Sequence, residues 1–143
     1  MAAGRGDAPF PGRGSAYGQA FALLERARGV LVEAAAADGP DERFRLAHLA
    51  ALRTAAAVLA DRGRPASARR RLISAWVLIE SVAPEYAEWA GYFAAGAAGR
   101  AAIEAGATHV VSSRAADDQL RSAWAFLDVV QARLGLLATP LAS

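Results

Sequence analysis

The stretch from Asp41 to Asp61 has the clearest hydrophobic pattern in the chain. Successive residues of an α-helix are separated by about 100° around its axis. At that spacing Arg43, Arg53 and Thr54 point away from a single apolar quadrant. This quadrant is formed by Phe44, His48, Leu52, Ala55 and Leu59. The pattern therefore predicts a central helix in which one of the chain's two histidines faces inward.

The same periodicity, together with helix-stop signals, predicts four further helices. The first has Ser15 as its N-cap and reaches about Ala37, where Asp38, Gly39 and Pro40 end it. It should form an antiparallel hairpin with the helix at 41–61. The others span about 72–82, 84–105 and 115–134, and Gly135 ends the last of them. The fold class is therefore all-α, a bundle of four main helices plus one short helix.

The predicted helix at 84–105 places Trp89, Phe93, Gly96 and Arg100 on one face. An arginine on an inward face needs a partner, and Glu104 lies one helical turn later. The helix also contains glycines at 91, 96 and 99, each of which weakens a helix by about 1 kcal/mol relative to alanine. These glycines indicate close approach of another helix, within the chain or across a dimer.

In the predicted helix at 115–134, one stripe is continuous, and Phe126 and Val129 lie on the opposite side. The stripe consists of Ala116, Leu120, Ala123, Trp124, Leu127, Val130 and Leu134. The two residues outside it indicate a second contact surface. The core is expected to hold most large aromatic side chains, namely Trp76, Trp89, Tyr92, Phe93 and Trp124.

Length and composition indicate one domain over residues 15–135 of the 143-residue chain. Residues 1–14 are expected to form a disordered tail, because glycine, proline and mixed charge occur there without periodicity. Residues 136–143 form a C-terminal tail without a strong signal. The start of the chain lacks the apolar core of a signal peptide, and the longest apolar run is too short to span a bilayer. A cytoplasmic protein without membrane contact is therefore expected.

All sixteen basic residues are arginines, yet the formal net charge is only +2. Five of the arginines lie between Arg62 and Arg71 without an acidic residue, which predicts a basic loop that is either solvated or in contact with phosphate. The chain has no cysteine, which excludes disulfides, a thiol nucleophile and cysteine-based metal sites. The two histidines, His48 and His109, are far apart in sequence. No metal or other cofactor is therefore expected, and His109 is predicted to be an exposed loop residue.

Three segments resemble the HEPN superfamily (higher eukaryotes and prokaryotes nucleotide-binding), in particular a stand-alone subfamily from high-GC bacteria. They read AHLAALRTAAAVLA, SAWVLIESVAPEYAEWAGYFAAGAAGRAAIEAG and ADDQLRSAWAFLDVV. The resemblance covers about 16–134 and is most specific where Trp76 precedes Ala83-Pro84-Glu85, at Glu88-Trp89 and at Ala125-Phe126-Leu127. It implies an α-helical bundle that commonly dimerises and a role connected with RNA or nucleotides. Many HEPN proteins are metal-independent ribonucleases, often toxins, whose motif is an arginine followed after four to six residues by a histidine. Others lack the motif and serve as binding modules.

Arg43 and His48 have the spacing of the ribonuclease motif, but they occur on the second predicted helix. The family motif belongs to the region from Gly99 to Gly106. There Arg100 matches the arginine, yet no histidine follows at a permitted distance, and the next one lies nine residues further on. In addition, a spacing of five residues separates two side chains by about 140° around a helix. The resemblance therefore favours a protein without catalytic activity.

Three functions remain open. The first is a non-catalytic HEPN homodimer that binds RNA, a nucleotide or a protein partner through a groove near Arg100 and the basic loop with Arg64, Arg69, Arg70 and Arg71. In this interpretation His48 is hydrogen-bonded in the core or at a dimer seam, and Glu104 pairs with Arg100. The second is a toxin-like ribonuclease that uses Arg43 and His48 across a dimer cleft, since the two can supply a proton acceptor and positive charge; a catalytic Glu104 is a further alternative. The third is a structural adaptor, for instance the partner of a nucleotidyltransferase in a toxin–antitoxin pair.

Overall fold

The structure, a computed structural model, describes residues 11–63 and 74–135, and the regular elements in these ranges are all helical. The predicted all-α class is confirmed. Residues 1–10, 64–73 and 136–143 lie outside the described part, and with them most of the expected N-terminal tail, the C-terminal tail and nearly all of the basic loop. Within the described ranges, no helix has both the length and the apolar character needed to cross a membrane.

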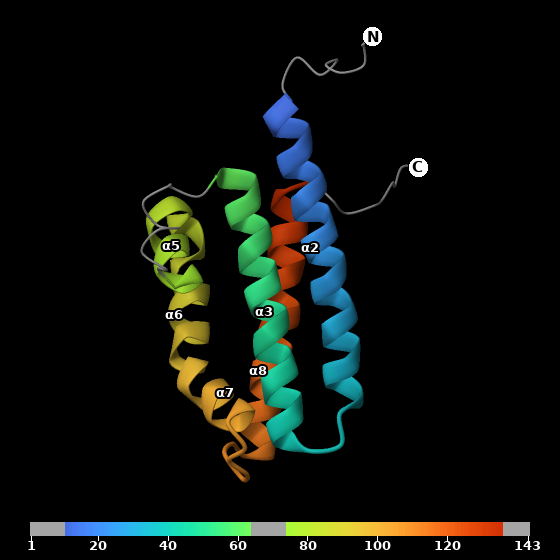
Figure 1. Ribbon diagram of the computed structural model, residues 1–143, viewed down its shortest axis with the longest axis vertical. Coiled ribbons are helices and arrows are strands. Elements are labelled where there is room, and N and C mark those ends of the chain that lie inside the picture. Colours follow the sequence, from blue (N-terminus) through green and yellow to red (C-terminus); the bar gives the residue numbers. More distant parts are fainter. Residues whose placement is uncertain (1–10, 64–73, 136–143) are drawn as a thin grey trace.

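Two long helices, α2 (Pro11–Ala36) and α3 (Pro40–Arg62), form the predicted antiparallel hairpin (Figure 1). The predicted start of the first helix at Ser15 is wrong, because α2 already begins at Pro11. Proline suits the first turn of a helix, since its fixed φ angle is close to the helical value and the N–H that it lacks would have no partner there. The turn at 37–39 and the limits of α3 agree with the prediction.

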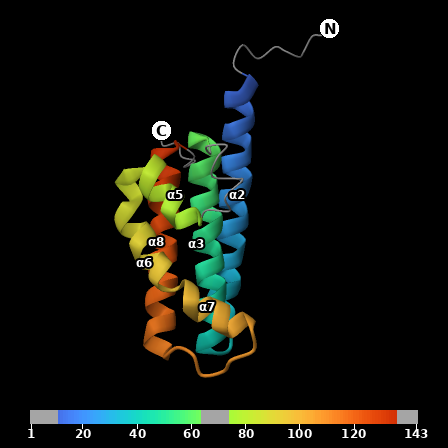
Figure 2. The same cartoon turned by 60° about the vertical axis from the view of Figure 1, so that its left-hand side comes forward.

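A short helix, α5 (Ala75–Val82), begins after Ser74, whose hydroxyl oxygen accepts a hydrogen bond from the backbone N–H of Trp76 at 3.1 Å. The predicted start near residue 72 lies outside the described residues. Instead of the one helix predicted over 84–105, the chain forms a 3-10 turn, η1 (Pro84–Tyr86), and two helices, α6 (Ala87–Ala95) and α7 (Ala97–Glu104). The break occurs at Gly96, a residue with low helix propensity. Figure 2 shows that α7 turns away from the direction of α6 near the end of the bundle where α3 begins.

The last helix, α8 (Ser113–Arg133), lies beside α3 in both views of the ribbon (Figures 1 and 2). It begins two residues before the predicted start, because the hydroxyl of Ser112 caps it by accepting a hydrogen bond from the N–H of Ala115 at 3.0 Å. Gly135 follows the helix with φ +71°, the left-handed conformation that glycine adopts most readily. The predicted role of this glycine at the helix end is therefore confirmed.

Helix α3 is the centre of the bundle and packs against α2, α5, α7 and α8. More than one of its faces is therefore covered, so Thr54, which points away from the apolar quadrant, is also buried. Its hydroxyl donates to the carbonyl of Ala50 at 3.0 Å, which satisfies the buried group. The buried residues of α3 are Phe44, Leu46, Ala47, His48, Ala50, Ala51, Thr54, Ala55, Ala57, Val58 and Leu59.

Aromatic rings from α5, α6 and α8 fill the space beside α3. The ring of Phe126 is fully buried and lies 5.4 Å from Trp89 and 5.6 Å from Phe93 between centroids. Phe126, which was predicted to need cover outside the apolar stripe, is covered by these rings, so its face of α8 belongs to the core. The buried face of α8 also contains Gln119 and Gln131, and these polar residues hide the true apolar stripe in the sequence. The prediction for Tyr92 is also wrong, because this side chain is 40% exposed.

Candidate functional site

His48 is fully buried in the middle of α3. Its Nε2 atom lies 2.8 Å from the main-chain oxygen of Phe93 in α6, and an oxygen of this kind can only accept a hydrogen bond. The ring is surrounded by Phe44, Trp76 and Phe93, with centroids 6.0–6.4 Å from its own. Burial lowers the pKa of His48, the Phe93 carbonyl opposes this shift, and the charge of Arg100 adds to it. His48 is therefore a neutral core residue that connects α3 to α6.

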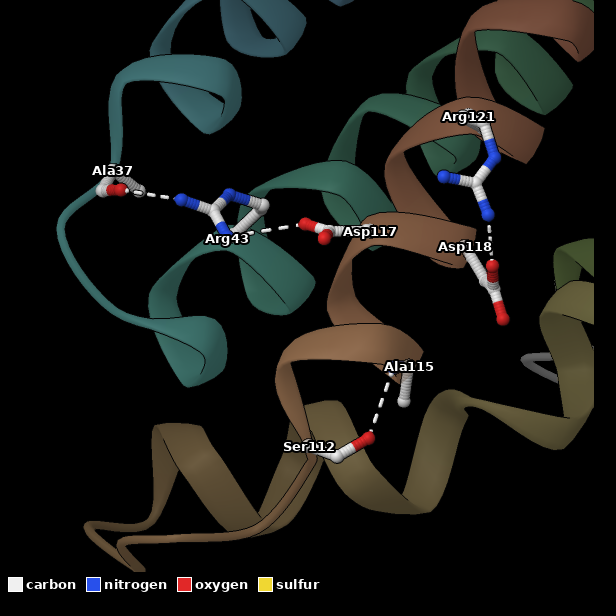
Figure 3. A network of polar contacts seen from close by, with 7 residues as sticks. All are labelled: Ala37, Arg43, Ser112, Ala115, Asp117, Asp118 and Arg121. Carbon is white, nitrogen blue, oxygen red and sulfur yellow. Dashed lines mark hydrogen bonds and ion pairs between the residues drawn. The ribbon is translucent and has the colours of Figure 1, made fainter.

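Arg43, the other half of the Arg–His pair, points to a different part of the molecule. Its guanidinium donates to a carboxylate oxygen of Asp117 at 3.2 Å and to the main-chain oxygen of Ala37 at 2.9 Å (Figure 3). It thereby joins the α2–α3 turn to α8. The structure does not bring Arg43 and His48 together, because one side chain lies at a polar surface contact and the other in the core.

Next to His48, the chain passes very close to α3 at Gly96. A methyl group on Gly96 would lie 3.1 Å from Cζ of Phe44, 3.3 Å from Cδ2 of His48 and 3.4 Å from Nε2 of Gln119. Gly99, one turn later in α7, also faces Phe44, whereas a methyl group on Gly91 would have nothing within 4 Å. The predicted close approach therefore exists at 96 and 99, where the glycines face side chains of α3, and not at 91.

Arg100 projects from α7 and donates to a carboxylate oxygen of Glu104 at 2.9 Å. The predicted pairing of these two residues is confirmed. The Nε atom of Arg100 is buried, and no residue in the described ranges bonds to it. The guanidinium thus has one bond, to Glu104, and the side chain, which is 24% exposed, is only partly accessible to a ligand.

The basic loop, which was predicted to share a groove with Arg100, lies almost entirely outside the described residues, and of its arginines only Arg62 can be placed. Gly96 and Gly99, which flank the start of α7, contact Phe44 near the beginning of α3, whereas Arg62 is the last residue of that helix. Eighteen residues of helix separate Phe44 from Arg62, which corresponds to about 27 Å. Arg62 itself is bound to Glu85 and to the carbonyl of Val82. Arg64, Arg69, Arg70 and Arg71 lie outside the described residues.

A network that sequence patterns did not reveal connects the start of α3 to the loop before α8. The carboxylate of Asp41 accepts hydrogen bonds from the backbone N–H groups of Val110 and Val111, both at 3.0 Å. These N–H groups hold the pKa of the Asp41 carboxyl below its usual value. In the same loop His109 is exposed, as predicted, and has φ +56°. The sequence indicated only that the negative charge of Asp41 suits the first turn of a helix. No local pattern indicated that its carboxylate would bond to backbone N–H groups about 70 residues away.

An open pocket of about 330 Å³ lies between this loop and the α2–α3 turn. Its lining residues are Gly39, Pro40, Asp41, Glu42, Thr108, His109 and Val111. Both acidic side chains are already engaged, Asp41 by the loop N–H groups and Glu42 by Arg45 at 2.7 Å. Their negative charge makes the pocket unsuited to a phosphate group. Within the described ranges, no three potential metal-binding side chains lie close enough together to hold a metal ion.

The described residues contain eleven arginines and thirteen aspartates and glutamates. Five of these arginines form ion pairs with carboxylates, namely Arg43, Arg45, Arg62, Arg100 and Arg121. The described helices therefore do not present a basic surface. The positive excess of the whole chain comes mainly from the four arginines between residues 64 and 71.

The comparisons with known proteins place these observations in a family. No curated protein and no solved structure matched the chain. The family described as SAV_6107-like HEPN matches residues 34–131, which include α3, α5, α6, α7 and nearly all of α8. The resemblance inferred from the sequence is thereby confirmed, and the chain belongs to the SAV_6107-like HEPN family.

Proposed function

We propose that this chain is a non-catalytic HEPN domain that acts by binding. The observation that supports it most directly is the environment of His48. A general base must come within hydrogen-bond reach of the proton that it removes, here that of an RNA 2′-hydroxyl. His48 is fully buried, its Nε2–H is bonded to Phe93, and Arg43 is engaged by Asp117. The chain has no other histidine that follows an arginine at the family spacing.

A ribonuclease assay tests this proposal. The purified chain is incubated with labelled single-stranded RNA in EDTA, and cleavage is followed with time. We expect no cleavage above the buffer control. The variant Arg43→Gln/His48→Gln is purified in parallel, because equal residual cleavage by both preparations identifies a contaminating nuclease. Cleavage by the wild type that the double variant loses would establish the Arg43/His48 ribonuclease and overturn the proposal.

The positive charge between residues 64 and 71 favours RNA as the partner, with its phosphates bound by Arg64, Arg69, Arg70 and Arg71. Clustered arginines attract phosphates without a precisely built pocket, and the described part of the bundle offers no comparable excess of positive charge. Arg100 is not needed for this function, because Glu104 already binds it.

Salt dependence tests RNA binding. The affinity for a single-stranded RNA is measured between 50 and 200 mM salt for the wild type and for Arg69→Gln/Arg70→Gln/Arg71→Gln. Each lost phosphate contact reduces the slope of log K against log salt by about 0.7, so loss of three contacts should reduce it by about 2. The control Arg26→Gln/Arg53→Gln/Arg114→Gln removes the same charge from the bundle and should bind nearly as the wild type. Absence of salt-sensitive binding, or an equal loss in the control, would contradict the proposal.

A homodimer is the second part of the proposal, supported by the outer face of α2. Tyr17, Phe21 and Val32 are 46%, 47% and 59% exposed on this helix, which lies at the edge of the bundle (Figure 1). Exposed apolar residues grouped on one element are typical of contact surfaces. Sedimentation velocity over a range of concentrations should show a dimer that Val32→Glu weakens, and a monomer at all concentrations would contradict this.

A nucleotidyltransferase-type partner, as in a toxin–antitoxin pair, stays a prediction from the family resemblance.

A further inference from the structure

The segment between the end of α6 and the first turn of α8 contributes little to the core. No residue in the range 94–115 is buried, and this is the longest such run in the described ranges. The preceding helices differ, since α5 and α6 both contribute buried residues, among them Trp76 and Phe93. A segment that buries so little apolar surface opens locally at a lower free energy than the core.

Residues 97–111, which comprise α7 and the loop after it, are here called the lid. Within the described part of the chain, the hydrogen bonds that join the lid to other elements through a side chain all end on Asp41. Its carboxylate accepts from the N–H groups of Val110 and Val111, both at 3.0 Å. The ion pair of Arg100 with Glu104, by contrast, lies within the lid and does not attach it to the bundle.

The apolar contact between the lid and α3 involves Phe44, which lies about one helical turn after Asp41. A methyl group on Gly99 would lie 3.5 Å from Cε1 of the Phe44 ring and 3.9 Å from Cγ1 of Val110. Gly99 of α7 and Val110 of the loop therefore lie against each other, and both lie next to the same turn of α3. The two parts of the lid are thus attached to one place on α3 and to each other.

The junction between the lid and the bundle is not closely packed. The open pocket of about 330 Å³ lies in this junction, with residues 39–42 on one side and three residues of the loop after α7 on the other. At its two ends the lid is bounded by Gly96, where α6 and α7 separate, and by Ser112, which caps α8. Both ends are therefore points at which a regular helix already begins or stops.

We propose that the lid opens by local unfolding as one unit while the rest of the bundle stays folded, and that Asp41 and Phe44 hold it closed. Opening uncovers the ring of Phe44, which is only 6% exposed when the lid is closed. An aromatic side chain at the beginning of α3 thereby becomes accessible in the open state alone. The inference concerns this end of the bundle and does not depend on whether the chain binds RNA.

Hydrogen exchange of backbone amides, followed by NMR, tests the proposal. Asp41→Ala removes the acceptor of two bonds to a charged group, so the amides of α7 and those of Val110 and Val111 should all exchange at least about tenfold faster, by a common factor. Amides in the middle of α3 should change much less, and the control Asp38→Ala should change neither group. Acceleration of Val110 and Val111 without α7 would overturn the proposal. Equal acceleration in α3 would overturn it too, because α7 would then open only when the whole chain unfolds.

A second variant changes the other part of the lid. Gly99→Ala adds a methyl group in ordinary contact with Phe44 and raises the helix propensity of α7, so exchange at Val110 and Val111 should slow about fivefold. The matched control is Gly91→Ala, which raises helix propensity in α6, outside the lid, and should leave these two amides unchanged. Slower exchange in α7 alone, or equal slowing by the two variants, would show that the lid does not open as one unit.

Discussion

Gly96 lies so close to Phe44 that a methyl group on its α-carbon would come within 3.1 Å of the Cζ atom of that ring. The replacement Gly96→Ala should therefore destabilise the protein by about 1–3 kcal/mol, because the Phe44 and His48 rings must move within a packed core. Urea unfolding followed by circular dichroism measures this change. The matched control is Gly91→Ala in α6, where the added methyl group meets open space, and this variant should gain up to about 1 kcal/mol from higher helix propensity. Equal effects at the two positions would contradict the prediction.

His48→Ala should lower the free energy of unfolding by about 2–5 kcal/mol. The change leaves a cavity among the rings of Phe44, Trp76 and Phe93, and the carbonyl of Phe93 loses its side-chain donor and keeps only the N–H of Gly96 at 3.0 Å. His109→Ala serves as the control and should change the free energy by less than about 0.5 kcal/mol, because that side chain is exposed. A small loss of stability in His48→Ala together with a large loss in His109→Ala would contradict the burial of His48 and the exposure of His109.

The burial of His48 also predicts the pH dependence of stability. Burial lowers the pKa of this histidine in the folded protein below the ordinary 6.5, so the unfolded chain takes up the proton first as the pH falls. Stability should be constant above about pH 7.5 and should decrease as the pH falls below 6.5, by at most about 1.4 kcal/mol per pH unit for one proton. The variant His48→Gln, which can still donate to Phe93, should lack this decrease.

The difference between wild-type and His48→Gln unfolding curves isolates the histidine from the carboxylates that titrate at lower pH. Two identical pH profiles would contradict the prediction. A His48 ring that titrates at or above pH 6.5 in NMR spectra of the folded protein would contradict it equally.

Asp41→Ala should release the loop that precedes α8. Removal of the carboxylate leaves the N–H groups of Val110 and Val111 without their acceptor, so their hydrogen exchange should become faster while exchange in the middle of α3 stays slow. Asp38→Ala is the control, since this neighbouring side chain is exposed and should not affect the loop. Because the backbone bonds lower the pKa of Asp41 below 3.8, their contribution should be present above that pH and lost as the pH falls further. Unchanged exchange at 110 and 111 in Asp41→Ala would contradict the assignment.

Local signals predict the helical parts of this fold well. The hairpin turn before Pro40, the inward His48 and the role of Gly135 at the end of α8 depend on residues close in sequence, and each agrees with the structure. The contact between Arg100 and Glu104 is of the same kind, since the two residues are one helical turn apart.

The parts that could not be predicted depend on tertiary contacts. Gly96 could be recognised as a weak point of the helix, but its close approach to Phe44 of α3 could not be predicted. Phe126 lay outside the predicted apolar stripe because the buried side of α8 also includes the polar residues Gln119 and Gln131, whose burial depends on partners in other helices. In the same way, distance in sequence does not give the separation in space between Arg100 and Arg62, which lie near opposite ends of α3.

The bonds from Asp41 to Val110 and Val111 also bear on how the chain reaches its native state. They join residues 69 and 70 positions apart, and the whole segment from α3 to α7 lies inside the loop that they close. Closing so long a loop costs entropy that is recovered only when the enclosed helices are already packed. These two amides should therefore be among the last to gain protection during refolding, and their exchange would report when the bundle is complete.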